Sequence, residues 1–240
     1  MKRLDSPGEA HAHFREADDV FFGSRIEAGQ LLAKRLEAYR GRNPLVLGIP
    51  RGAVPMAQVI AESLRGELDV VLVHKLGAPY QEEFAIGSVS ERGDVHLSQE
   101  VELYGIEKPY IDQEVARQLE VLRRRRAAYT PVRPSIPPTG RVVIVVDDGV
   151  ATGWTMIAAL RSIRSQKPAR LIAAMAVAPP RAVATMKHEA DEVVCLATPA
   201  SFYAVGQFFA DFRQVTDEEV TEILARAAAA WGSTQGRRGE

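Results

Sequence analysis

Short apolar stretches alternate with longer amphipathic stretches along most of the chain. The short stretches are rich in aliphatic and β-branched residues, as buried strands are, whereas the longer ones repeat their apolar residues at helical spacing. In residues 25–39, for example, Ile26, Leu32 and Leu36 fall near one helical face. The pattern predicts strands over residues 44–49, 69–74, 142–146, 170–178 and 192–197. It predicts helices over residues 25–39, 54–64, 110–129, 154–165, 181–189 and 217–230.

The segments between these elements carry residues that break regular structure. Glycines and prolines punctuate residues 76–93, so a loop-rich region is expected there. Residues 131–138 include four prolines, which predict an extended connector. Asp217 is expected to cap the last helix. We expect a flexible segment over residues 1–20, one folded domain over residues 21–230 and a disordered tail over residues 231–240.

The alternation of strands and helices predicts an α/β fold. Its mostly parallel, Rossmann-like central sheet should be flanked by helices on both faces. In such folds ligands bind outside the carboxyl ends of the strands, near the point where the strand order reverses. Three polar groups directly follow expected strands: the turn at Pro50, Arg51 and Gly52, the pair His74–Lys75, and the pair Asp147–Asp148. We therefore expect the chemistry of the protein to lie at this edge of the sheet.

Composition narrows the possible partners. The 240 residues suffice for one sizeable domain, and a formal net charge of −1 argues against general capture of nucleic acid or an anionic membrane. The single cysteine, Cys195, excludes an intrachain disulfide and a cysteine-based zinc site, and its apolar surroundings predict a buried, inert thiol. No segment resembles a signal peptide or a membrane span, so the expected location is the cytoplasm.

The pair Asp147–Asp148 ends the most apolar of the expected strands. A metal pocket, a Walker B strand and a hydrolase nucleophile can all begin in this way. The chain contains neither the P-loop pattern nor the glycine pattern of a dinucleotide site, which disfavours both kinds of nucleotide site. The residues after the pair therefore decide between the remaining possibilities.

Those residues suit a phosphate group. Small side chains let backbone N–H groups converge on an anion, Thr152 and Thr155 add hydroxyl donors, and a helix N-terminus adds a favourable dipole. The two carboxylates would repel the same phosphate, so we expect them to accept hydrogen bonds from neutral hydroxyls such as those of a ribose. Together the two halves describe a site for a ribose 5-phosphate.

The run VVIVVDDGVATG at residues 142–153 resembles the signature of type I phosphoribosyltransferases that binds phosphoribosyl pyrophosphate (PRPP). Four apolar residues, two acids, two variable positions and then a small residue with Thr-Gly match the signature in full. The resemblance implies that Asp147 and Asp148 hold the ribose hydroxyls. It also implies a small hood, centred on residues 199–216, and a mobile lid loop. The residues implied to wrap the 5′-phosphate are Val150, Ala151, Thr152, Gly153, Trp154 and Thr155.

The run GIPRGAVPMA at residues 48–57 resembles the pyrophosphate loop of the same family. Pro50, Arg51 and Gly52 are therefore implied to bind pyrophosphate, with Lys75 from the start of the lid region as a further contact. Arg51 taken alone could equally be a surface arginine in a turn, and His74 is as readily structural as ligand-binding. The resemblance implies that Asp148, Arg51 and Lys75 are the catalytic residues.

The acceptor is the least determined part of the site. Phe202 and Tyr203 lie in the expected hood and suit stacking on an acceptor base, although either ring could simply pack in the core. The resemblance spans roughly residues 22–224 and points to a bacterial subgroup with an unassigned acceptor. It departs from the hypoxanthine-guanine subgroup, which puts a purine acceptor in doubt. The four arginines at residues 123–126 spread around a helix, which favours a solvated helix end over a phosphate contact across an oligomer interface.

The resemblance implies transfer of ribose 5-phosphate from PRPP to a nitrogenous base or similar small-molecule acceptor, with release of pyrophosphate. Mg²⁺ is the implied cofactor; no direct protein ligand is expected, and Asp147 is a contact through water. The sequence does not identify a general base, for which Asp148 and a hood residue are the candidates. The alternatives are a PRPP or nucleotide sensor without turnover, and a protein that recognises a nucleotide product or hydrolyses PRPP slowly. A homodimer is compatible with the family, and neither nucleic acid nor a membrane is an expected partner.

Overall fold

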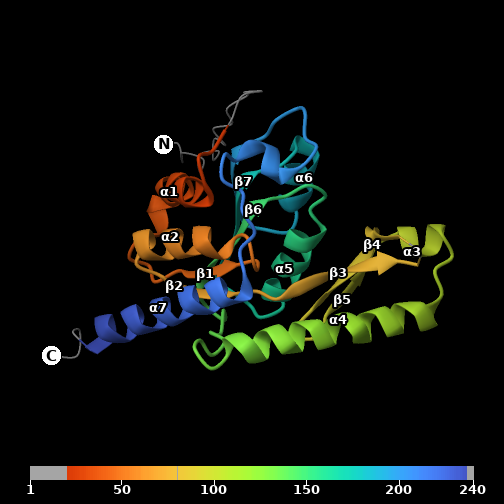
Figure 1. The fold of residues 1–240 in the computed structure, drawn as a ribbon, viewed down its shortest axis with the longest axis horizontal. Helices are drawn as coiled ribbons and strands as arrows, with labels where there is room; N and C mark the ends of the chain where they lie inside the picture. The colour runs from red at the N-terminus through yellow and green to blue at the C-terminus, as the bar shows by residue number, and fades with distance from the viewer. Residues whose placement is uncertain (1–20, 80, 237–240) are drawn as a thin grey trace, which may run out of the picture.

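A five-stranded sheet forms the centre of the computed structural model, which describes residues 21–79 and 81–236 (Figure 1). Its strand order is β2-β1-β6-β7-β8, and every neighbouring pair is parallel. This arrangement confirms the predicted α/β fold with a parallel central sheet. The strands are β1 (Leu45–Gly48), β2 (Glu67–Val70), β6 (Val142–Gly149), β7 (Arg170–Val177) and β8 (Glu192–Ala197).

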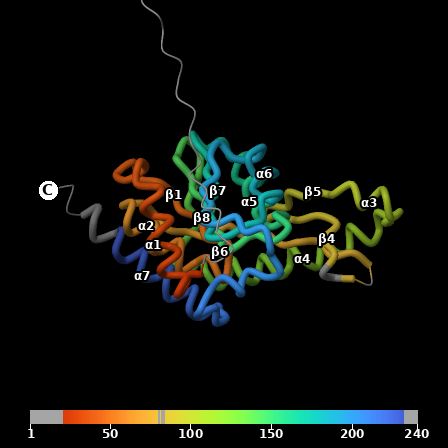
Figure 2. Tube along the Cα trace, turned by 90° about the horizontal axis from the view of Figure 1, so that it is seen from above, coloured from red at the N-terminus to blue at the C-terminus, as the bar shows by residue number. Residues whose placement is uncertain are grey.

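Helices cover both faces of this sheet because successive strand residues point to opposite sides. Ile144 and Val146 of β6 belong to one apolar cluster, which includes side chains from α1 (Arg25–Arg35), α2 (Val54–Leu64) and α7 (Asp217–Gly236). Val143 and Val145 belong to a second cluster, which includes side chains from α5 (Trp154–Arg164) and α6 (Pro180–Met186). Figure 2 shows α1 and α2 on one side of the strands and α5 and α6 on the other.

The chain segment that follows β2 and precedes β6 forms an antiparallel arm, which projects from the core (Figures 1 and 2). A three-stranded sheet and two helices build it. These elements are β3 (Val73–Ala78), β4 (Gln81–Ser90), β5 (Val95–Leu97), α3 (Glu100–Leu103) and α4 (Lys108–Tyr129).

The arm corrects two predictions. Residues 76–93 are mostly strand rather than loop, and the single strand expected over residues 69–74 divides into β2 and β3, which belong to different sheets. The glycines of this region predicted a loop, but two of them lie within strands, where the strand geometry requires glycine. Gly77 sits where the β3–β4 register shifts, and a Cβ on Gly87 would lie 2.4 Å from the carbonyl oxygen of His96 in β5. Glycine therefore permits an irregular ladder and a close approach of two strands.

Other boundaries differ by a few residues. Residues 37–39, expected within the first helix, form the short 3₁₀ helix η1 (Glu37–Tyr39). A second one, η2 (Val205–Phe208), lies in residues 199–216, the segment predicted as the hood and referred to by that name below. Thr216 rather than Asp217 caps α7, because its Oγ1 accepts from the N–H of Glu219 at 3.2 Å while a Glu219 carboxylate oxygen accepts from the Thr216 N–H. This helix continues to Gly236, beyond its predicted end at residue 230 and into the predicted tail.

The predicted flexible segment over residues 1–20 and the last four residues of the predicted tail lie outside the described residues. Within the part of the chain that the structure describes, no helix is long and apolar enough to cross a membrane.

Arg126 anchors the arm to the core. Its guanidinium donates to both carboxylate oxygens of Glu91 at 2.6 Å and to the Val70 carbonyl at 3.2 Å, and it lies 3.5 Å from Asp69 Oδ1. Burial raises the pKa of the Asp69 carboxyl, and the charge of Arg126 opposes that rise. The prediction of a solvated helix end is therefore wrong for Arg126, whereas Arg123 and Arg124 are exposed.

Cys195 lies in β8 as a free, buried thiol whose Sγ is 3.0 Å from the carbonyl oxygen of Ala197. Burial raises the pKa of this thiol to about 12. Because the thiolate is the reactive form, we expect Ellman's reagent to leave the folded protein unmodified at pH 8 and to titrate one thiol after denaturation. Rapid labelling of the folded protein would contradict the burial of Cys195.

Candidate functional site

The candidate site lies where the strand order of the central sheet reverses. The chain passes from β1 to β2 on one side, and β6 then pairs with the other side of β1. Gly48 is in register with Val146, and the N–H of Ile49 donates to the Val146 carbonyl at 3.0 Å. The turn at Pro50, Arg51 and Gly52 therefore lies beside the acidic pair, as expected for a ligand site at a switch point.

The alternation of β6 separates its two carboxylates. Asp148 continues the even-numbered positions that face α1 and α2, while Asp147 continues the odd-numbered positions that face α5. Arg25, the first residue of α1, reaches Asp148: its Nε donates to Oδ2 at 2.8 Å, and both side chains are largely buried. The Asp147 carboxylate accepts from the backbone N–H of Asp148, which lies 2.9 Å from Oδ1.

Gly52 lets the turn after β1 approach the acidic pair. A Cβ on Gly52 would lie 2.3 Å from Asp148 Oδ2 and 3.2 Å from a terminal guanidinium nitrogen of Arg25. No side chain larger than hydrogen fits there while Asp148 and Arg25 keep their positions. The preceding Pro50–Arg51 peptide bond is cis. The turn, the acidic pair and α1 thus meet at one point.

The acidic pair is electrostatically unusual. Burial raises the pKa of Asp147, and the neighbouring charge of Asp148 raises it further. Burial also raises the pKa of Asp148, although the Arg25 guanidinium opposes that rise. The two adjacent carboxylates repel other anions, and the buried guanidinium of Arg25 offsets part of their negative charge, so the pair is suited to neutral hydroxyl groups.

The residues after the pair form a short loop that ends at the N-terminus of α5. Val150 is buried and its N–H donates to the Val177 carbonyl at 2.9 Å, whereas Ala151 and Thr152 are exposed. Gly153 takes a φ of +92° at the N-cap of α5, and no side chain among the described residues caps this helix. An uncapped helix N-terminus leaves backbone N–H groups available to an anion. Trp154 and Thr155, both half-buried, form the first turn of the helix.

Arg51 forms a long ion pair with an aspartate that also accepts a hydrogen bond from a tyrosine. One of its guanidinium nitrogens lies 3.6 Å from Asp217 Oδ2, and the Tyr129 hydroxyl donates to Asp217 Oδ1 at 2.6 Å. Burial and this hydrogen bond raise the pKa of Tyr129. The side chain of Arg51 is thus directed by residues from α4 and α7.

His74 and Lys75 do not follow a strand, contrary to the prediction. They lie within β3, opposite Val89 and Ser88 of β4. His74 Nδ1 lies 3.1 Å from the carbonyl oxygen of Lys75, and burial lowers the pKa of the imidazole. These contacts support the structural interpretation of His74. Lys75 is half-buried in the first part of the arm.

The two aromatic acceptor candidates in the hood differ in their exposure to solvent. Phe202 packs on Phe208, with ring centroids 5.3 Å apart, and contributes to the edge of the core. Tyr203 is 90% exposed. Val205 lies against the start of the loop between β6 and α5, since a Cβ on Gly149 would be 2.4 Å from its Cγ1. The structure therefore assigns Phe202 to packing, and only Tyr203 of the two acceptor candidates presents its ring to solvent.

Sequence reasoning missed four neighbours of the site: Arg25, Phe212, whose ring lies against the Arg25 guanidinium, Tyr129 and Asp217. Arg25 carried one signal: it opens a helix directly after the Ser24 cap, where the helix dipole favours acids over cations. A cation at this position indicates a nearby carboxylate. The other three residues had no comparable signal, because their roles depend on chain segments that are far apart in the sequence.

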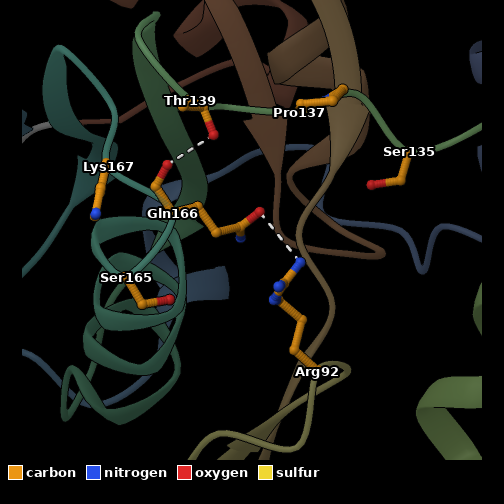
Figure 3. A pocket seen from close by; sticks show the side chains of 7 residues that line it. All are labelled: Arg92, Ser135, Pro137, Thr139, Ser165, Gln166 and Lys167. Carbon is orange, nitrogen blue, oxygen red and sulfur yellow. Dashed lines mark hydrogen bonds between the residues drawn. The ribbon is translucent and has the colours of Figure 1, made fainter.

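A separate cavity of about 430 Å³ lies at the far end of α5 (Figure 3). Gln166 sits at its centre: its carbonyl oxygen accepts from Thr139 Oγ1 at 2.9 Å, and its amide oxygen is 3.4 Å from Arg92. The helix of 11 residues, about 16 Å long, separates this cavity from the loop between β6 and α5. None of the predicted site residues lines it. Its lining comprises Arg92, Ser135, Pro137, Thr139, Ser165, Gln166 and Lys167.

The fold and the site define a doubly wound α/β protein whose switch point carries an acidic pair and a helix N-terminus that no described side chain caps. A family model described as "Phosphoribosyl transferase domain" matches residues 23–213. The chain therefore belongs to the phosphoribosyl transferase family, and its fold is that of the type I members, as the sequence motif indicated.

Known relatives agree with this assignment. A crystal structure of TT1426 from Thermus thermophilus is 47% identical, covers 86% of this chain and 98% of that one, and superposes with a TM-score of 0.76. Two Mycobacterium tuberculosis proteins, from strains CDC 1551 and H37Rv, are each 43% identical over 208 residues and are provisionally named phosphoribosyl transferases. The match covers 86% of this chain and 47% of each relative, so the chain spans about half the length of these curated relatives.

Proposed function

We propose that the protein transfers ribose 5-phosphate from PRPP to a nitrogenous base or similar acceptor, with release of pyrophosphate. One observation carries the proposal: Asp147–Asp148, the Arg51 turn and the uncapped N-terminus of α5 lie at one edge of the sheet. A diol, a pyrophosphate and a terminal phosphate each meet suitable groups at that edge.

The donor would bind through two complementary halves. The 5′-phosphate accepts hydrogen bonds from N–H groups at the start of α5 and from the hydroxyls of Thr152 and Thr155. The ribose hydroxyls donate to Asp147 and Asp148. Arg25 occupies one direction around Asp148 Oδ2, but a carboxylate offers about four acceptor positions, so room remains for a ribose hydroxyl.

The pyrophosphate would meet Arg51 and Lys75. The planar guanidinium of Arg51 matches phosphate oxygens, and Gly52 lets the backbone come close. The present partner of Arg51 is Asp217, at 3.6 Å, and this pair is partly exposed to solvent. Because this ion pair is long, a bound pyrophosphate, which carries more charge than Asp217, can replace Asp217 as the partner of Arg51.

Mg²⁺ fits this donor set as a cofactor held mainly by the substrate. Among the described residues, no group of three or more His, Cys, Asp or Glu side chains is placed to hold a metal. Mg²⁺ usually keeps several waters and binds one or two carboxylates together with substrate phosphates. Asp147 would contact it through water. When bound, the ion neutralises charge that develops on the pyrophosphate.

In this reaction the protein mainly positions the reactants and stabilises the charge on the leaving group. The bond between ribose C1 and the pyrophosphate oxygen breaks, a bond from C1 to the acceptor nitrogen forms, and the proton of that nitrogen passes to a base. Asp148 or a hood residue would take this proton. Arg51 and Lys75 would stabilise the charge that moves onto the leaving group, and no covalent intermediate is needed.

The proposal is tested by measuring pyrophosphate release from PRPP and Mg²⁺ with a panel of purine, pyrimidine and other nitrogenous acceptors. We expect release with at least one acceptor. PRPP binding without release for any acceptor would instead support a sensor. Release at the same slow rate with and without acceptors would support hydrolysis of PRPP.

Arg51→Ala should weaken PRPP binding roughly 10- to 100-fold, because a hydrogen bond to a charged group contributes about 1.5–3 kcal/mol. Binding of ribose 5-phosphate, which lacks the pyrophosphate, should be unchanged. Isothermal titration with both ligands measures the difference. Arg124→Ala is the matched control, since that arginine pairs with Glu120 on an exposed helix surface. Equal losses for both ligands would show that Arg51 maintains the pocket rather than contacting pyrophosphate.

A further inference from the structure

One buried guanidinium joins three walls of the candidate site. Arg25 Nε donates to Asp148 Oδ2 at 2.8 Å, and its Nη1 donates to the Arg213 carbonyl in the hood at 2.8 Å. The guanidinium carbon lies 3.9 Å from the centroid of the Phe212 ring. Its other terminal nitrogen lies against Gly52, 3.2 Å from where a Cβ would be. The acidic pair, the hood and the turn after β1 thus contact the same side chain.

We infer that Arg25 is a positioning residue that couples occupancy of the acidic pair to the position of the hood. The inference rests on the proposed function, because it takes the ribose of PRPP as the group that binds Asp147–Asp148. Arg25 itself is not expected to touch the donor or the acceptor. It acts through Asp148 on one side and through Phe212 and Arg213 on the other.

Backbone hydrogen bonds also join the hood to the segment before α1. The Phe22 N–H donates to the Phe208 carbonyl, and the Ala210 N–H donates to the Phe22 carbonyl, each at 2.8 Å. The Asp211 N–H donates to the Gly23 carbonyl at 3.1 Å. These bonds attach the hood to the start of α1, and Arg25 extends that attachment to β6.

The chemistry of arginine suits this task. The guanidinium is planar and rigid, so its N–H donors and its stacking face act in fixed directions at the same time. A ribose that draws the Asp148 carboxylate toward its hydroxyls therefore shifts the guanidinium, and with it the ring of Phe212 and the carbonyl of Arg213. A lysine would keep the charge but could not stack and donate in two directions together.

The coupling has a reciprocal consequence. Suppose that PRPP binding orders the hood through Arg25 and that a second ligand binds the ordered hood more tightly. The factor by which PRPP strengthens binding of that ligand is then also the factor by which the ligand strengthens binding of PRPP. The hood is where the acceptor is expected, so Arg25 would connect the donor and acceptor halves of the site. This connection is a property of the tertiary structure and does not depend on which acceptor binds.

Hydrogen exchange of the full chain tests the inference first without ligand. In Arg25→Ala, the amides of Ala210 and Asp211 should exchange faster than in the wild type. Guanidinium chloride at low millimolar concentration should restore the slow exchange, because the ion can fill the vacated space, whereas sodium chloride at equal ionic strength should not. Unchanged exchange in the variant would overturn the inference, as would restoration by both salts.

The second part uses PRPP. In the wild type, PRPP should slow exchange at Ala210 and Asp211; in Arg25→Ala this slowing should be lost, and PRPP affinity should fall roughly tenfold or more. Arg25→Lys should recover part of the affinity but not the ligand-dependent slowing. Ligand-dependent slowing that persists in Arg25→Ala would refute the coupling.

The two proposals fail differently. A wild type that binds no PRPP removes the proposed function, while the ligand-free exchange experiment still reports whether Arg25 holds the hood. A wild type that binds PRPP without any change at the hood amides leaves the proposed function intact and removes the coupling. Arg124→Ala serves again as the control and should match the wild type in every measurement.

Discussion

Isothermal titration of the double variant Asp147→Ala and Asp148→Ala should detect no binding of PRPP. The two carboxylates are the groups at the strand end that can accept hydrogen bonds from both ribose hydroxyls. Each such bond involves a charged acceptor and contributes about 1.5–3 kcal/mol, so losing both should weaken binding by roughly 10²- to 10⁴-fold.

The control must separate loss of binding from loss of the fold. Removing Asp148 leaves the buried charge of Arg25 without its partner, which destabilises the protein. Asp147→Asn avoids this problem, because the Arg25–Asp148 pair stays intact and the side chain keeps its shape. We expect the single variant to melt close to the wild type and to bind PRPP weakly. Undiminished affinity in a folded double variant would mean that the donor site lies elsewhere.

Gly52→Ala should damage both the site and the stability of the protein. The added Cβ would lie 2.3 Å from Asp148 Oδ2, and that carboxylate cannot move aside easily because Arg25 holds it. Overpacking of a fixed site typically costs about 1–3 kcal/mol in the free energy of unfolding. We expect a lower midpoint in urea and, because Asp148 must shift, weaker binding of PRPP.

Gly23→Ala is the matched control for this substitution. A Cβ there would also approach a carboxylate oxygen, Glu27 Oε2 at 2.8 Å, but that side chain is exposed and can turn away with the loss of only a solvent-exposed hydrogen bond from the Gly23 N–H. Its effect on unfolding should stay within about 0.5 kcal/mol. Equal destabilisation by the two substitutions would show that Asp148 is not held in place by Arg25.

The order of strand, turn and helix start in the candidate site could be predicted because it depends on neighbouring residues. An apolar run that ends in Asp147–Asp148 makes a buried strand with acids at its carboxyl end. Gly153 followed by a helical pattern makes an uncapped helix start. The turn after β1 was predictable for the same reason, since Pro50 and Gly52 closely follow a strand. In each case the interaction that shapes the backbone lies within a few positions of the residues concerned.

The arm could not be predicted in this way. Its strands pair in an antiparallel sheet that leaves the parallel core, and Gly77 and Gly87 stand at a register shift and at a close strand approach. In the sequence these glycines look the same as loop glycines. Arg126 likewise stands in a run of four arginines, and only its contacts with Glu91, Val70 and Asp69 distinguish it from its neighbours.

The sequence by itself determined the class of fold, the edge of the sheet that carries the site and the resemblance to phosphoribosyltransferases. Short-range patterns suffice for these, because strand, turn and helix start are each encoded in a few consecutive residues. Only the tertiary structure placed Arg25 on Asp148, a partner 123 positions away, and joined that pair to the hood. A buried cation is stable only where its acceptors converge, and that convergence exists only once α1, β6 and the hood have packed together.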